Sequence, residues 1–116
     1  MNNDPITAPA PGTGLLLKLD GTRKVLTPAK PRRGFQFTEL YGPLACRTIE
    51  VHQLIDGPFK GMLLLFDEEG GFKGEDNFNL QASRLWAEAY PPVEYPYNNG
   101  GILWGNVLLT HDKLLK

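Results

Sequence analysis

The sequence predicts an α+β domain with a mainly antiparallel sheet of about five strands and two helices, in the order ββαββαβ. Two observations predict this fold class. Asp20-Gly21 lies between two short runs of strand character, which is a strong signal for a β-hairpin. Residues 61–66, GMLLLF, form an apolar run typical of a central strand covered on both faces. Strands joined by tight turns favour such a sheet with its helices packed on one face.

The first two strands are expected on either side of Asp20-Gly21. In the first run, Leu15, Leu17 and Leu19 share one face, and the second run covers residues 22–26. An Asp-Gly pair favours a two-residue type I′ turn, because both central residues of that turn need a positive φ.

A basic loop, PAKPRRG over residues 28–34, separates this hairpin from the first helix. The helix is indicated by helical spacing of apolar residues, with Thr38 as its N-cap. Gly42-Pro43 predicts that the helix is short or distorted. The apolar residues that carry the spacing are Phe37, Leu40, Tyr41 and Leu44.

The third strand is expected within residues 46–55, CRTIEVHQLI, where β-branched and polar side chains alternate, and residues 61–66 give the fourth. Asn77 or Asn79 is expected to cap the second helix, which Pro91-Pro92 ends. The last strand is expected over residues 102–110. Gly105 in its middle suggests a bulge or the close approach of another group.

The acidic stretch after the fourth strand, FDEEGGFKGEDN, raises the question of a metal site. A calcium loop of EF-hand type needs a glycine at its sixth position, and Phe72 stands there when the count starts at Asp67. We therefore expect residues 68–71 to form a turn with positive-φ glycines rather than a metal site. We expect no metal and no cofactor.

Composition limits the classes of function. The chain has 116 residues, with 12 Lys+Arg and 13 Asp+Glu, and this balance argues against general nucleic-acid binding. No apolar run is long enough to span a membrane, and the N-terminus has no signal-peptide pattern, so a cytoplasmic protein is expected. We expect a flexible proline-rich arm over residues 1–13 and a single domain over residues 14–116, with a core small enough to make a homodimer natural.

Signs of nucleophilic or zinc chemistry are weak. Cys46 and His52 lie six residues apart on the expected strand, which is beyond hydrogen-bond reach. Ser83 has no G-x-S-x-G elbow around it, and the two histidines and one cysteine are too scattered for zinc spacing.

A binding site is indicated where the second helix begins behind glycines, because a helix N-terminus favours anions and nearby cations can complete such a site. An aromatic beside Gly105 adds a surface where another group could come close. The plainer interpretations are solvated cations, a helix cap and a core tryptophan. The predicted ligand-binding or partner-binding residues are Arg32, Arg33, Lys73, Asn79, Trp104 and Asn106.

Several short motifs follow one another in a characteristic order: a hairpin, Ile49-Glu50, the sequence DEEG over residues 67–70, Lys73, an N-x-x-A pattern, and GNVLL over residues 105–109. In this order the chain, from Gly14 onward, resembles a small domain family of unknown function found in bacteria, phages and mobile elements. The resemblance implies no activity. It implies that a phage or mobile-element setting is to be expected.

These observations favour a non-enzymatic binding protein that sequesters a small anionic ligand or blocks a host protein, such as a defence enzyme. One alternative is a small hydrolase or transferase that uses Asp67, Glu69 and His52. The other alternative is a structural or assembly protein without a ligand.

Overall fold

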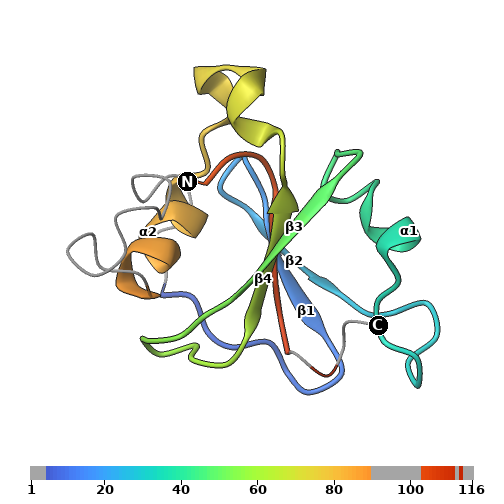
Figure 1. Cartoon of the computed structure of the whole chain (residues 1–116). Coiled ribbons are helices and arrows are strands. Elements are labelled where there is room, and N and C mark those ends of the chain that lie inside the picture. The colour runs from blue at the N-terminus through green and yellow to red at the C-terminus, as the bar shows by residue number, and fades with distance from the viewer. Residues whose placement is uncertain (1–4, 90–102, 112, 114–116) are drawn as a thin grey trace.

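The computed structural model describes residues 5–89, 103–111 and 113 (Figure 1). It contains a five-stranded antiparallel sheet and two helices, so the predicted α+β class and the order ββαββαβ are confirmed. Two short 3-10 helices, η1 and η2, lie between β4 and α2. The elements are β1 (Gly14–Leu17), β2 (Arg23–Leu26), α1 (Phe37–Leu40), β3 (Ile49–Gln53), β4 (Leu63–Asp67), η1 (Gly70–Lys73), η2 (Glu75–Asn77), α2 (Leu80–Ala89) and β5 (Val107–Thr110).

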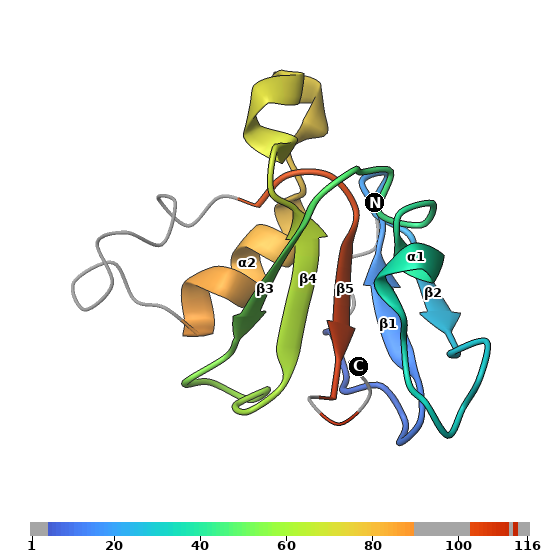
Figure 2. The same ribbon diagram turned by 45° about the vertical axis from the view of Figure 1, so that its right-hand side comes forward.

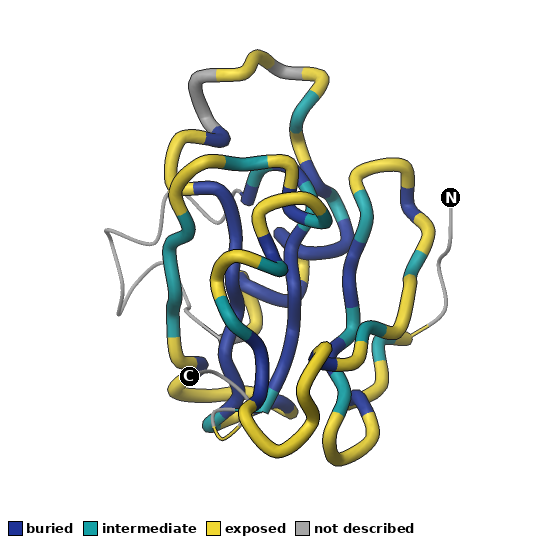
Figure 3. Tube along the Cα trace, turned by 90° about the vertical axis from the view of Figure 1, so that its right-hand side faces the viewer, coloured by how far each residue is buried: buried dark blue, intermediate teal, exposed yellow. Residues whose placement is uncertain are grey.

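The last strand lies in the middle of the sheet. The strand order is β2-β1-β5-β4-β3, and all pairs are antiparallel. Leu17 of β1 lies opposite Val107 of β5, and Leu65 of β4 lies opposite Leu108. Every residue of β4 and β5 is buried, and these central strands form the dark core of Figure 3.

The sheet is covered on both faces. Leu85 and Trp86 of α2 belong to a core cluster with the β4 residues Leu64 and Phe66. A second cluster on the other face packs Phe35, Leu40 and Leu44 against residues that include Leu65 and Leu108. Figure 1 shows α2 and α1 on opposite sides of the strands. The prediction that both helices pack on one face is wrong, because alternate side chains of an apolar strand such as β4 need cover on each side.

The predicted β-hairpin is present, but its turn differs from the predicted type I′. Lys18 N–H donates to the Thr22 carbonyl (2.9 Å), and Gly21 N–H donates to the Lys18 carbonyl (3.0 Å). Gly21 has a φ of +91°, whereas Asp20 is not among the residues with positive φ. This is the three-residue hairpin in which a glycine bulge follows a turn. The Asp20 carboxylate fixes it by accepting hydrogen bonds from the Thr22 N–H (2.9 Å) and hydroxyl (2.6 Å).

The first helix is a single turn whose cap lies two residues earlier than predicted. Its N-cap is Gln36, which makes no side-chain capping bond, so the prediction of Thr38 as the cap is wrong. The helix ends at Leu40, before Gly42-Pro43, as the sequence predicted. The strands of the structure are shorter than the predicted ones. The predicted helix end at Pro91-Pro92 lies outside the described residues.

The described part of the N-terminal arm contacts the domain. Ile6 packs against the core cluster under α2, and the Pro9 carbonyl accepts a hydrogen bond from His111 Nε2 (3.0 Å). Among the described residues, no helix has the length and apolar character needed to cross a membrane.

Candidate functional site

One end of the sheet gathers polar groups from four segments. Asp67, the last residue of β4, lies opposite Ile49, the first residue of β3. The register of β5 on β1 places Asn106 beside the turn of the first hairpin, where its Oδ1 accepts a hydrogen bond from Leu19 N–H (2.8 Å). The 3-10 segment η1–η2 projects from this same end, at the top of Figure 2.

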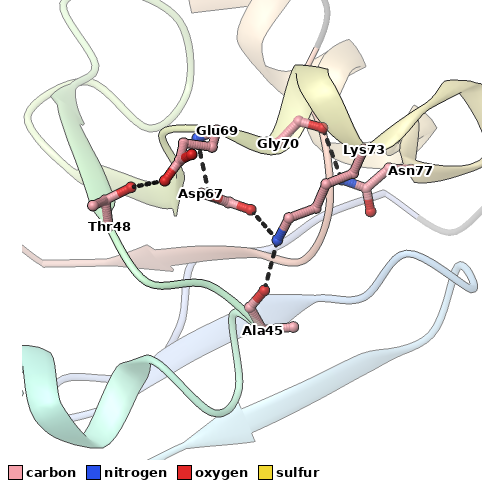
Figure 4. A network of polar contacts seen from close by, with 7 residues as sticks. All are labelled: Ala45, Thr48, Asp67, Glu69, Gly70, Lys73 and Asn77. Atoms are coloured by element: carbon pink, nitrogen blue, oxygen red, sulfur yellow. Dashed lines mark hydrogen bonds and ion pairs between the residues drawn. The ribbon is translucent and has the colours of Figure 1, made fainter.

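Asp67 and Lys73 form the centre of this sheet end (Figure 4). Only 3% of the Asp67 side chain is exposed, and its Oδ1 accepts a hydrogen bond from Glu69 N–H (2.9 Å). Lys73 Nζ lies 2.5 Å from Oδ2, which makes an ion pair, and it donates to the Ala45 carbonyl (3.0 Å). Apart from this ion pair, the buried Oδ2 has no hydrogen-bond partner among the described residues.

Two hollows meet at this ion pair. One holds about 140 Å³ and the other about 230 Å³. Asp67 and Lys73 line both hollows. The first is also lined by Leu19, Leu44, Ala45, Asn77, Gly105 and Asn106, and the second by Arg47 and Glu69.

Two asparagine amides hold the segments around the first hollow. Asn106 Nδ2 donates to the Pro43 carbonyl (2.9 Å), which ties β5 to the loop after α1. Asn77 Nδ2 donates to the Gly70 carbonyl (3.1 Å), and the Asn77 carbonyl accepts from Gly105 N–H (2.6 Å). These bonds place η1–η2 against β5, so the sheet end is a built surface and not a set of free loops.

The glycine that opens η1 is required for space. A Cβ on Gly70 would lie 2.9 Å from Cβ of Trp104, and Gly70 is not among the glycines with positive φ. The prediction that Gly70 supplies a positive φ to a turn over residues 68–71 is therefore wrong. The turn occupies Glu68 and Glu69, and η1 follows directly. The group expected to approach closely near Gly105 is the Asn77 side chain, 3.4 Å from where a Cβ would lie.

Of the two predicted cap residues, Asn77 and Asn79, it is Asn79 that caps α2. Its Oδ1 accepts from Ala82 N–H (3.1 Å), and its Nδ2 donates to the carbonyls of Leu17 (2.9 Å) and Gly105 (2.7 Å). Asn79 is only 1% exposed. The start of α2 is therefore part of the core, and the Asn79 amide is already engaged at both of its polar atoms.

The structure brings together some of the predicted site residues. Lys73 and Asn106 line the first hollow, and Trp104 is a half-buried neighbour that packs edge-on against Phe78 (6.1 Å between ring centroids). The two arginines, Arg32 and Arg33, are exposed in the loop that follows β2. That loop leaves the sheet at its opposite end, as Figure 2 shows, so it does not contribute to the hollows.

Sequence reasoning missed Arg47 and Asn77, and it treated Asp67 only as a metal ligand or a catalytic group. A signal for Arg47 existed, because it is among the first residues of the third expected strand, which must lie beside the end of the fourth in an antiparallel pair. No comparable signal pointed to Asn77, whose role depends on contacts with residues distant in sequence.

The groups of the enzyme alternative lie on different faces of the sheet. His52 stacks on Phe66 (5.6 Å between centroids), contacts Trp86 edge-on (5.0 Å) and pairs with Glu50 (2.6 Å). Since Phe66 faces α2, the next residue, Asp67, faces the other way. The geometry therefore gives Asp67 no histidine partner from this strand pair.

The thiol near the hollows is not activated. Burial raises the pKa of Cys46, the Asp67 carboxylate raises it further, and Lys73 lowers it less than these two effects raise it. A raised pKa reduces the thiolate fraction at neutral pH, and the thiolate is the nucleophile. Among the described residues, no three His, Cys, Asp or Glu side chains gather as metal ligands would.

No family model, curated protein or solved structure matches the chain. The resemblance to a phage and mobile-element domain family therefore stays a prediction.

Proposed function

We propose that this chain is a small non-enzymatic binding protein, and that its contact surface is the sheet end around Asp67 and Lys73. The observation that carries the proposal is the position of this ion pair between two hollows lined by polar groups. The described groups there can donate and accept hydrogen bonds, but the thiol has a raised pKa and His52 lies on the other face. Such a surface suits recognition better than covalent chemistry.

The size of the hollows favours a protein partner or a small head group. Pockets that enclose a whole drug-sized ligand usually hold about 300–1,000 Å³. The two hollows hold about 140 and 230 Å³, which is enough for a side chain or a few polar atoms each. Blocking a host protein, in the phage or mobile-element setting that the resemblance implies, is consistent with these sizes.

A small anionic ligand remains the second form of the proposal. The exposed Arg47 favours it, since its guanidinium lines the larger hollow beside Lys73. An anion would have to compete with the buried Asp67 carboxylate for the Lys73 ammonium, and Glu69 adds another negative charge to the same hollow. This balance of charges makes a purely anionic ligand the less favoured partner.

The test is capture from host lysate with two matched charge reversals. Arg47→Glu changes the exposed rim of the larger hollow, and Arg33→Glu makes the same change in the loop at the opposite end of the sheet. We expect Arg47→Glu to reduce the captured partner at least about tenfold, and Arg33→Glu to leave capture unchanged. Mass spectrometry of the eluate covers proteins and retained small molecules.

Other outcomes would point elsewhere. Loss of capture with Arg33→Glu alone would move the contact surface to the basic loop. Chemical conversion of a retained molecule would support the hydrolase or transferase alternative. No retained partner with any variant would support a structural or assembly role, and the molecular mass in solution would then show whether the predicted homodimer forms.

A further inference from the structure

We infer that Asp67 is a receptor for a cationic nitrogen of the partner, an ammonium or a guanidinium, and that Lys73 is its displaceable internal occupant. This inference rests on the proposed function and names the chemistry of the partner. Its starting point is a buried carboxylate oxygen that lines two hollows, has no hydrogen bond among the described residues and is balanced by the ammonium of a half-exposed lysine.

The acceptors of this receptor converge on one point. Asp67 Oδ2 and the Ala45 carbonyl lie 2.5 Å and 3.0 Å from the same nitrogen, Lys73 Nζ. Both are oxygen acceptors, so the group that binds them must be a donor, and a positive charge suits the carboxylate. An anion placed there would be repelled.

The receptor is held in place by bonds that do not involve Lys73. Glu69 N–H fixes the other Asp67 oxygen (2.9 Å). Ala45 has a φ of +50° and is held by two backbone bonds, from Ala45 N–H to the Gly42 carbonyl (3.0 Å) and from Cys46 N–H to the Tyr41 carbonyl (3.1 Å). The acceptor geometry would therefore persist when the lysine side chain leaves.

Lys73 is the solvent-accessible member of the ion pair. Its side chain is 48% exposed, and its contacts among the described residues are Asp67 and the Ala45 carbonyl. It ends a single-turn 3-10 helix and is followed by Gly74 with a φ of +94°. A lysine is a flexible point charge, and here it leaves its partner oxygen without a well-aligned hydrogen bond. A donor with better alignment can replace it.

Displacement would open space beside both hollows, because Lys73 lines each of them. The released ammonium and Arg47 would then be free to meet a negative group on the same partner. The chemistry shared by all such ligands is a cationic nitrogen on a short chain. It can come from a small amine or guanidine, or from a Lys or Arg side chain of a protein.

The test is a titration followed by amide NMR, with butylammonium, butylguanidinium and a short blocked arginine peptide as probes. The reporter is the Glu69 amide, which donates to Asp67. We expect saturable shifts in the wild type and none with Asp67→Asn, while Asp56→Asn, the same change in an exposed turn, keeps the wild-type response. Lys73→Ala removes the internal competitor. If Lys73 fills the site about nine-tenths of the time, this variant should bind about tenfold more tightly.

Lys73→Met removes the positive charge of Lys73 but keeps most of the volume of its side chain. It should bind the probes more weakly than Lys73→Ala. A response to the peptide alone would assign the nitrogen to a protein side chain, and a response to all three probes would admit small amines. If neither the wild type nor Lys73→Ala responds, or if Asp67→Asn responds like the wild type, the inference is wrong.

This failure can be told apart from failure of the proposed function. Lysate capture that survives Asp67→Asn but is lost with Arg47→Glu would leave the binding surface in place and remove the cation receptor. Capture that no sheet-end substitution affects would remove both.

Discussion

Asn79 joins three segments of the chain through one buried side chain, and Asn79→Ala measures its contribution to stability. The change removes the cap acceptor of Ala82 N–H and the donors of two carbonyls, those of Leu17 and Gly105. Loss of an N-cap costs about 0.5–2 kcal/mol. Each buried acceptor left without its donor adds on the order of 1 kcal/mol. Because the site is 1% exposed, water does not replace the lost bonds, and we expect a total of about 3 kcal/mol.

Urea unfolding provides the measurement. With a slope of about 1–3 kcal/mol/M, a loss of about 3 kcal/mol lowers the midpoint by roughly 1–3 M while the slope stays unchanged. Asn79→Asp separates the two roles, since aspartate caps a helix as well as asparagine but cannot donate to the carbonyls. We expect Asn79→Asp to lose much of the stability that Asn79→Ala loses. If Asn79→Ala changes stability by no more than about 0.5 kcal/mol, as a plain surface site would, the contacts described here do not stabilise the fold.

Three further predictions concern positions around the sheet end. Gly70→Ala should destabilise the fold by about 1–3 kcal/mol, because its Cβ would lie 2.9 Å from Trp104 Cβ, whereas Gly42→Ala, with nothing within 4 Å, serves as the control in thermal unfolding. Ala45→Gly should raise stability by about 0.5–1 kcal/mol, since it relieves a left-handed φ of +50°, and an unchanged melting temperature would contradict this. Cys46 should react with iodoacetamide at pH 8 more slowly in the folded chain than in urea, because its pKa is raised in the fold; equal rates would show an unshifted thiol.

The strands could be predicted because their signal is local. Alternation and short apolar runs reflect burial on a pleated surface, and the two helices followed from spacing and from the Asn79 cap. The same run that identified β4 also carried the information that both faces need cover. The helices were predicted on one face because an α+β sheet often has them there, although a strand that is apolar on both sides needs cover on both faces.

The turns were harder, because a turn type depends on partners outside the turn. Asp20-Gly21 suits a type I′ turn by composition, but the Asp20 carboxylate binds Thr22 and the Leu19 amide binds Asn106. Those bonds favour a longer loop with its positive φ at Gly21 alone. Gly70 shows the same limit, since its need for space arises from Trp104, which lies 34 residues further along the chain.

The site could be predicted only where a residue lies close to one end of a strand. Lys73 follows β4 and Asn106 directly precedes β5, and an antiparallel pair brings the end of one strand beside the start of the other. Arg32 and Arg33 were included for their charge, and charge does not indicate at which end of a sheet a loop emerges. The burial of Asp67 could not be predicted in this way. An acidic residue that directly follows an apolar strand is usually the first residue of a solvated turn, but here β4 extends one residue further and buries Asp67. A buried carboxylate needs a positive charge nearby. Lys73, at the end of the short helix η1, provides it, and the Lys73 side chain is half exposed. In the proposed cation receptor, this internal partner balances the carboxylate when the protein is alone, and a better-aligned donor of the partner would displace it.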